Sequence, residues 1–147
     1  MKIKGLYLIL FIGLLSCRSM GEVTPDYFVG TWERVGDVAA GDVVDINIFS
    51  ETEIEAVMIR VSETSAHFGF VIGDIKWRLV RRINAREFEI DNLNATMVTH
   101  ADGRITDRRK FFVRFHLIVV NRNLIELTAL DEEENRVGNR QQWVRIN

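Results

Sequence analysis

The sequence predicts an all-β fold, an antiparallel up-and-down β-barrel of about eight to ten strands that follows an N-terminal export segment. Short runs rich in Val, Ile, Phe, Trp and Thr recur at intervals of roughly ten residues, with turn residues between them. The 147 residues suit a single domain, and a hydrophobic content of 47% allows a packed core. Because closure removes the unpaired edges of many short strands, we expect a barrel rather than an open sandwich.

The N-terminal segment has the pattern of a bacterial export signal. Lys2 and Lys4 precede a stretch of ten apolar residues, 6–15. This stretch is too short to span a bilayer core, which needs about 20 residues, but it has the length of the apolar region of a signal peptide. Residues 14–17, Leu-Leu-Ser-Cys, resemble a lipobox, and Cys17 is the only cysteine of the chain.

The resemblance to bacterial lipoproteins implies that Cys17 is a lipidation site. In that family the thiol receives a diacylglyceryl group, residues 1–16 are removed as the signal peptide, and the new amine usually receives a fatty acid such as palmitate. Two or three acyl chains anchor a protein stably, whereas one gives marginal binding. The resemblance thus implies a lipid anchor in the bacterial cell envelope, in the outer rather than the inner membrane because Arg18 follows the cysteine. An ordinary cleaved signal peptide with a free cysteine is the alternative.

The remaining chain is expected to form a short spacer and one domain. Residues 17–26 are small and polar, typical of a lipidated spacer, and 27–147 would form the barrel. After removal of the signal peptide, 17 basic residues stand against 21 acidic ones, a net charge of −4. This balance indicates no nucleic-acid partner. We interpret the basic groups at 78–82 and 104–110 as solvated strand faces, with a patch for lipid headgroups or an acidic partner as the alternative.

Each expected strand rests on β-rich or alternating residues between turn signals. Alternation is clearest at 75–83, where Trp77 and Leu79 share one face and Lys76, Arg78 and Arg82 the other. The same alternation recurs at 87–91 and 110–119. The expected strands are 28–35, 43–49, 55–62, 66–72, 75–83, 88–91, 95–100, 105–120, 124–130 and 141–146.

The segment 51–62 fits two structures. Ser50 and Glu53 form a possible capping box, and the apolar residues that follow also match helical spacing. Its β-branched residues favour a strand instead, as does the alternation in the neighbouring segment 66–72. We expect a strand, with a helix as the alternative.

Residues 28–35, Phe-Val-Gly-Thr-Trp-Glu-Arg-Val, resemble the first strand of the calycin group, the lipocalins and fatty-acid-binding proteins. The resemblance implies that Gly30 permits a close strand approach, that Trp32 plugs the closed end of the barrel, and that Arg145 packs across the indole. No room exists for the helical lid of fatty-acid-binding proteins, and no cysteine pair is present. The match is therefore to lipocalin-like lipoproteins as an architecture. The alternative is that Trp32 is an ordinary buried aromatic residue.

A lipocalin-like barrel would have a ligand cavity inside, lined by the inward-pointing residues of its strands. Arg81 shares the alternation phase of Trp77 and Leu79, so it would either place a charge inside the barrel or lie at its rim in water. The candidate ligand-binding residues of the interior are Phe68, Phe70, Trp77, Leu79, Arg81, Phe111, Val113 and Phe115.

The sequence offers no recognisable catalytic or metal-binding motif. His67, His100 and His116 fall on separate expected strands without the spacing of a zinc site. A nucleophile elbow and a phosphate-binding glycine loop are absent from the sequence, and the acidic run 131–134 is typical of a solvated turn. We therefore expect no enzyme activity, no metal and no cofactor.

The combined interpretation is a membrane-anchored, lipocalin-like lipoprotein that binds a small apolar or amphipathic ligand in its barrel. The alternative is a protein-interaction module with a filled barrel, which inhibits an enzyme or contacts an envelope or host partner. A carrier requires an internal cavity of roughly 300 Å³ or more, whereas an interaction module requires an exposed apolar patch among the loops.

Overall fold

The computed structural model describes residues 21–48 and 54–147. This part of the chain forms eight strands, one short α-helix and one 3-10 helix. In chain order the elements are η1 (Pro25–Phe28), β1 (Gly30–Val35), β2 (Val43–Ile48), β3 (Ile54–Arg60), α1 (Glu63–His67), β4 (Ile75–Arg82), β5 (Glu87–Thr99), β6 (Ile105–Asn121), β7 (Leu124–Leu130) and β8 (Arg136–Arg145).

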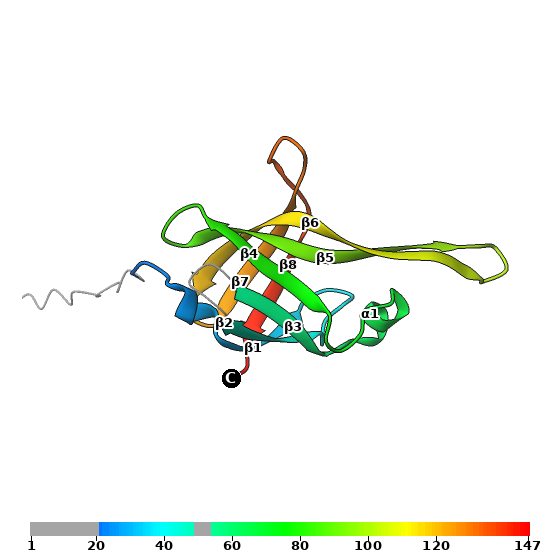
Figure 1. Cartoon of the computed structure of the whole chain (residues 1–147), viewed down its shortest axis with the longest axis horizontal. Coiled ribbons are helices and arrows are strands. Elements are labelled where there is room, and N and C mark those ends of the chain that lie inside the picture. The colour runs from blue at the N-terminus through cyan, green and yellow to red at the C-terminus, as the bar shows by residue number, and fades with distance from the viewer. Residues whose placement is uncertain (1–20, 49–53) are drawn as a thin grey trace, which may run out of the picture.

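The eight strands form one closed antiparallel barrel (Figure 1). Each strand pairs with the next in sequence, and β8 pairs back with β1. Trp32 of β1 lies opposite Val44 of β2 on one side and Arg145 of β8 on the other. The predicted all-β class and up-and-down barrel are therefore confirmed, at the lower end of the expected strand number.

The ambiguous segment 51–62 forms a strand where the structure describes it. β3 begins at Ile54, while 51–53 lie outside the described residues. Ile54, Ala56 and Met58 are buried and alternate with more exposed side chains, which is the period of a half-buried strand. The β-branched composition predicted this outcome correctly.

The strand predicted at 66–72 is wrong. Residues 63–67 form α1, which begins after Ser62, whose Oγ accepts a hydrogen bond from the Ser65 N–H at 3.2 Å. Gly69 then adopts a φ of +92°, a left-handed conformation that ends the helix and favours glycine. Phe68 and Phe70 lie on either side of Gly69, so their spacing in the sequence resembles the alternation of a strand.

β5 is longer than predicted, and it forms with β6, which lies where it was predicted, a hairpin that extends beyond the barrel. The predicted strands 88–91 and 95–100 are one strand, β5, of 13 residues, and its partner β6 has 17. The apolar–polar alternation of this strand is interrupted in the sequence because a polar residue, Asn92, takes an inward, fully buried position between Trp77 and Val113. β8 also begins five residues before the predicted 141, with Arg136 opposite Leu130.

The core fills the barrel at the end where the described chain begins. Trp32, Trp77 and Trp143 are essentially fully buried inside the barrel, and each side chain of this type buries roughly 150–250 Å² on folding. Val23 is also buried, and its N–H donates to Ala85 O at 3.0 Å. The end of the expected spacer 17–26 therefore packs on the barrel, so the packed domain begins slightly earlier than 27.

Candidate functional site

One end of the barrel is closed by an aromatic floor. Trp32 Nε1 donates to Phe28 O at 2.9 Å, which attaches η1 across the barrel end. The Arg145 guanidinium lies 4.4 Å above the Trp32 ring centroid and 5.2 Å from that of Tyr27. The predicted contact between Arg145 and Trp32 is thus present, and it adds a cation-π attraction to the pairing of β1 with β8.

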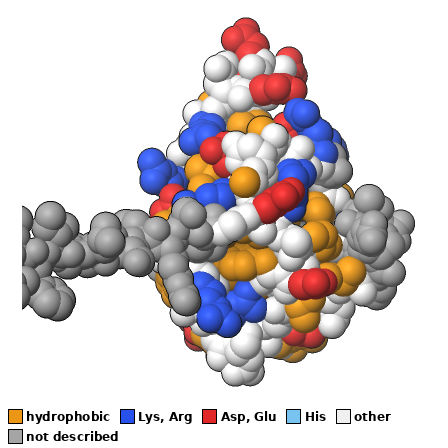
Figure 2. Space-filling view, turned by 90° about the vertical axis from the view of Figure 1, so that its left-hand side faces the viewer, with side chains coloured by type: hydrophobic (Ala, Val, Ile, Leu, Met, Phe, Trp, Pro, Cys, Tyr) orange, Lys and Arg blue, Asp and Glu red, His pale blue; other side chains and the backbone are white. Residues whose placement is uncertain are grey.

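Gly30 permits a close approach at this floor. Its φ is +119°, and a Cβ at this position would lie 2.6 Å from Asn147 O. Arg145 also donates to Val29 O at 2.6 Å and to Tyr27 O. Figure 2 views this end of the molecule, where hydrophobic and basic side chains lie next to one another on the surface. The closed end is therefore tightly packed, with the donors of Trp32 and Arg145 occupied.

The opposite end of the barrel, which we call the mouth, contains a cavity of about 340 Å³. It lies beside α1 and the base of the β5–β6 hairpin, and it reaches solvent next to Val38 and Phe111, which are both exposed. Apolar and polar side chains contribute about equally to the lining. The lining residues are Arg34, Val38, Ala39, Thr64, Ser65, Phe68, Phe70, Lys76, Asn94, Ala95, Thr96, Phe111 and Gln141.

A buried carboxylate holds α1 beside the mouth. Asp42 is fully buried at the start of β2, and it accepts hydrogen bonds from Ser65 Oγ at 2.6 Å and from the Ser62 N–H at 2.8 Å. These bonds connect the β1–β2 turn to the helix cap. They place Thr64 and Ser65 of α1, together with Phe68, which follows the helix in the chain, in the cavity wall.

Lys76 is the buried cation of the mouth. Residues 75 and 77 lie opposite the adjacent residues Val57 and Ala56, so Lys76 is the extra residue of a β-bulge. Its exposed fraction is 2%, and it lines the cavity. Nζ donates to Leu93 O at 2.5 Å and lies 4.5 Å from the Phe70 ring centroid. Burial, with a smaller contribution from Arg34, lowers the pKa of the Lys76 ammonium to about 7.

The other polar groups of the cavity differ in how fully they are bonded. Arg34 forms two hydrogen bonds to Asp37 Oδ2, at 2.9 and 2.7 Å, so its charge is compensated locally. Gln141 is buried, and among the described residues its Oε1 has no hydrogen-bond partner. An unpaired amide oxygen in a cavity wall is available to a donor on a ligand or to water.

The predicted interior residues divide between the filled core and the mouth. Trp77 and Phe115 are buried in the core, and Leu79 and Val113 are half-buried against it. Phe68, Phe70 and Phe111 line the cavity, the first two from the α1 turn rather than from a strand. Phe111 is 42% exposed, so its expected place inside the barrel is wrong: it lies at the cavity rim, on the hairpin. The ligand-binding role of these residues stays a prediction.

Arg81 does not lie inside the barrel. A second bulge on β4 puts Leu79 opposite Ile90 and Arg81 opposite Glu89, which reverses the alternation after Leu79. The Arg81 side chain is 56% exposed on the outer surface. The alternative that it carries a charge into the cavity is therefore wrong.

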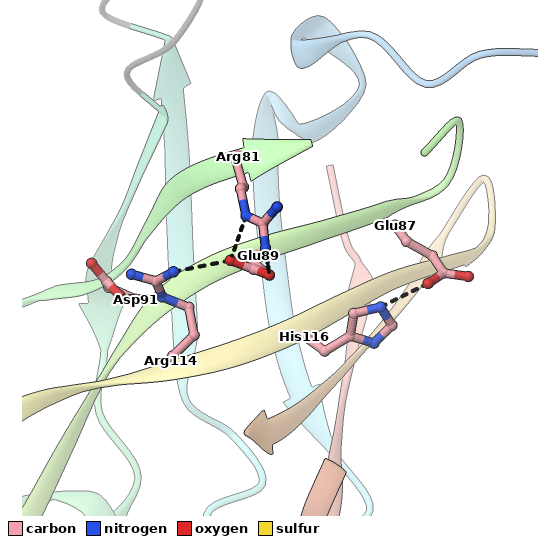
Figure 3. Close-up of polar contacts among 6 residues, drawn as sticks. All are labelled: Arg81, Glu87, Glu89, Asp91, Arg114 and His116. Carbon is pink, nitrogen blue, oxygen red and sulfur yellow. Dashed lines mark hydrogen bonds and ion pairs between the residues drawn. The ribbon is translucent and has the colours of Figure 1, made fainter. Parts of the chain in front are cut away.

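Arg81 belongs to a polar cluster on the outer face of β4, β5 and β6 (Figure 3). Its guanidinium donates to both oxygens of Glu89, at 2.8 and 2.5 Å, and Arg114 donates to Glu89 at 2.9 Å and to Asp91 at 2.9 Å. The hydrogen bonds from Arg81 and then Arg114 lower the pKa of the Glu89 carboxyl. Glu89 is buried although it is on the outer face, so its two cations stabilise it as a carboxylate.

His116 and Glu87 form a second pair in this cluster. His116 is buried, its Nε2 lies 2.8 Å from Glu87 Oε2, and its Nδ1 has no partner among the described residues. The hydrogen bond with His116 is the main cause that lowers the pKa of Glu87. No described hydroxyl or thiol is hydrogen-bonded to His116, so the pair lacks an adjacent nucleophile. We interpret the cluster as an ion-pair network that orders the sheet.

Sequence reasoning missed the two most distinctive groups of the mouth, Lys76 and Gln141. Regular alternation places Lys76 outside, and only the bulge brings it into the barrel. Gln141 follows polar residues at the start of the predicted last strand, so nothing in the sequence distinguishes it from an exposed amide.

No protein-family model, curated protein or solved structure matches the chain. In residues 21–48 and 54–147, no group of three or more His, Cys, Asp or Glu side chains is arranged to hold a metal ion. No helix in the same residues has both the length and the apolar character needed to cross a membrane. The fold and the cavity define a closed eight-stranded β-barrel with one filled end and one hollow end.

Proposed function

We propose that this protein binds a small apolar or amphipathic molecule in the mouth of its barrel. The cavity of about 340 Å³ carries this proposal, because sites for small molecules begin at roughly 300 Å³. Its wall combines the aromatic rings of Phe68, Phe70 and Phe111 with polar side chains that can orient a ligand.

We further propose a lipocalin-like type of barrel. Three features support it: the left-handed Gly30 at the start of β1, the buried Trp32 at the closed end, and Arg145 of β8 over the indole. They occur together at one end of an eight-stranded antiparallel meander. A deep ligand cavity in the middle of the barrel is not part of this proposal, since the three tryptophans fill that region.

The lipid anchor on Cys17 remains part of the proposal and gives the domain an orientation. Cys17 precedes Gly21 by four residues, which span at most about 14 Å when extended. The described chain begins at the end of the barrel opposite α1 (Figure 1). An anchor at Cys17 in a bacterial envelope membrane would therefore keep the closed end near the lipid surface, and the cavity would open away from it.

Native mass spectrometry of the full chain carrying Cys17→Ser, purified without detergent, tests ligand binding. We expect an additional mass that dissociates as a small molecule on activation. A chain that consistently shows its bare mass, and that binds no decanol or decanoate in solution, would contradict the proposal. The same substitution tests the anchor, because the wild-type chain should fractionate with membranes and the variant should not.

A protein-interaction function is the second candidate, and the β5–β6 hairpin favours it. The hairpin extends past the barrel (Figure 1) and exposes Val98, Phe111 and Phe112. Exposed aromatic residues on a projecting hairpin are suited to a protein partner. Phe112→Ser leaves the cavity wall intact, so loss of a captured partner together with unchanged decanol binding would favour this second function.

A further inference from the structure

We propose that the mouth recognises the anionic headgroup of a monocarboxylate amphiphile, with Lys76 and Gln141 as the residues that bind the carboxylate. This inference rests on the proposed function, and it adds the chemical class of the ligand and the residues that select it. Three properties of the cavity support this ligand class: hydrogen-bonding groups that the protein does not use, the arrangement of charges around them, and the apolar side chains of the remaining wall.

Lys76 has donors that the protein does not use. An ammonium has three N–H groups, and within the described chain the contacts of Lys76 Nζ are Leu93 O and the Phe70 ring. Among the described residues no carboxylate oxygen lies within 4.0 Å of Lys76 Nζ, whereas Lys110 pairs with Asp74 at 2.8 Å. A buried cation without a carboxylate partner is costly, and an anion that enters the cavity would supply that partner.

Gln141 supplies a second polar group in the same wall. It is buried, it lines the cavity, and its Oε1 has no described partner. A side-chain amide offers two N–H donors as well as its oxygen, so rotation of the amide lets it donate to a carboxylate. Lys76 and Gln141 line the same cavity, and a carboxylate has two acceptor oxygens, so it can pair with the ammonium through one and accept from the amide through the other.

The neighbouring charges leave Lys76 as the cation available to a ligand. Arg34 is engaged by Asp37, Asp42 by the α1 cap, and Asp74 by Lys110 at 2.8 Å. These four groups are the charged neighbours that influence Lys76: Arg34 lowers its pKa, and Asp37, Asp42 and Asp74 raise it. Burial lowers the pKa of Lys76 by more than the three carboxylates raise it. A bound anion would raise this pKa again and so restore the proton that burial removes.

The rest of the cavity suits an alkyl chain rather than a polar body. Ala39, Ala95 and the rings of Phe68, Phe70 and Phe111 surround the polar end. The modest volume of about 340 Å³ selects a medium-length chain over a long one. Decanoate, 1-decanol and decyltrimethylammonium carry the same tail on an anionic, a neutral and a cationic headgroup, and they are the probes for this site.

Isothermal titration of the full chain carrying Cys17→Ser separates headgroup recognition from binding of the tail. At about pH 6.5, where the carboxylate is ionised and Lys76 is largely protonated, decanoate should bind at least about tenfold tighter than decanol, and the cationic probe weakest. Equal binding of decanoate and decanol would overturn the headgroup inference and leave the cavity function standing. Failure of all three probes would contradict the proposed function itself.

Lys76→Met and Arg104→Met form a matched pair of variants. Lys76→Met should weaken decanoate binding about tenfold or more and leave decanol within about threefold. Arg104→Met removes an equal charge from an exposed side chain outside the cavity wall, and should change neither ligand by more than about threefold. An equal loss of decanoate affinity in both variants would show general attraction by surface charge and overturn the assignment of Lys76.

Proton uptake gives a readout that does not depend on a variant that folds. Decanoate binding to the unsubstituted Lys76 at about pH 8 should take up close to one proton, seen as a dependence of the binding heat on the ionisation heat of the buffer. Above about pH 7 the affinity should fall by roughly tenfold per pH unit, because the protonated fraction of Lys76 falls in that proportion. Binding of decanoate without proton uptake and without pH dependence would overturn the proposal.

Discussion

The two ends of the barrel differ in how far their polar groups are bonded. At the closed end, the Trp32 N–H and the Arg145 guanidinium have protein partners, and the aromatic rings are buried. At the mouth, Lys76 of β4 and Gln141 of β8 border a cavity, and both have hydrogen-bonding capacity that the described chain does not use. Buried side-chain atoms without a described hydrogen-bond partner also occur in the core, at Trp77 and Trp143. The mouth differs from the closed end because its incompletely bonded groups border a cavity that a ligand can enter, whereas the closed end is packed.

Trp32→Ala should have the largest effect, because it removes the centre of the closed end. We expect a loss of about 3–5 kcal/mol in the free energy of unfolding, from lost burial and from the cavity that remains. Urea denaturation followed by circular dichroism measures it. Trp32→Phe is the matched control and should cost less, since it keeps an aromatic ring. A loss below about 1 kcal/mol for the alanine variant would show that the floor is not stabilising.

Lys76→Met, in contrast, should raise the free energy of unfolding of the protein without ligand. The folded pKa of about 7 is below the unfolded 10.5, so at and below about pH 7 folding bears the full cost of the buried amine. In this pH range the free energy of unfolding of the variant should exceed that of the parent by on the order of 2 kcal/mol. The upper limit is about 5 kcal/mol, because each pKa unit corresponds to about 1.36 kcal/mol.

This advantage of Lys76→Met should disappear as the pH rises from about 7 towards 10.5, since the unfolded chain then also loses the proton. Unfolding curves at several pH values, with Arg104→Met as the control, measure the effect. A Lys76→Met variant that is less stable than the parent across this range would show that Lys76 is a structural group.

Glu89→Gln tests the outer polar cluster, in which the charged groups, unlike Lys76 of the mouth, have ion-pair partners within the described chain. We expect a loss of about 1–3 kcal/mol at neutral pH, because Arg81 and Arg114 lose their shared carboxylate. Glu55→Gln, which affects a more exposed pair with Arg78, should cost about 1 kcal/mol or less.

The pH dependence of the Glu89 effect has a defined sign. The folded pKa of Glu89 is lowered below its usual 4.5, so its contribution is present above that value and is lost as the pH falls through the folded pKa. The difference between the parent and Glu89→Gln should therefore shrink only in acid. A constant difference across the acidic range would contradict the assigned role of the carboxylate charge.

The sequence predicts the barrel well because alternation and turn residues are local signals. The strand at 75–83, the first strand with Gly30 and Trp32, and the final strand with Arg145 are present where the pattern places them. The short helix α1 was not predicted because five residues carry no readable period, and Phe68 and Phe70 imitate a strand around Gly69.

The chemistry of the mouth could not be predicted because it depends on two bulges in β4. Regular alternation places Lys76 outside and allows Arg81 inside, whereas the structure places them the other way round. A bulge is set by the pairing with the neighbouring strands, which the sequence of one strand does not reveal. A single extra residue therefore decides which cation lines the cavity.

Hydrogen–deuterium exchange of the full Cys17→Ser chain, with and without decanoate at about pH 6.5, shows where on the barrel the ligand binds. We expect slower exchange at α1, at the turn that follows it and around Leu93 to Thr96, with the floor around Trp32 and Arg145 unchanged. Slower exchange confined to the closed end, or no change in the mouth at a decanoate concentration that saturates binding, would contradict binding in the mouth.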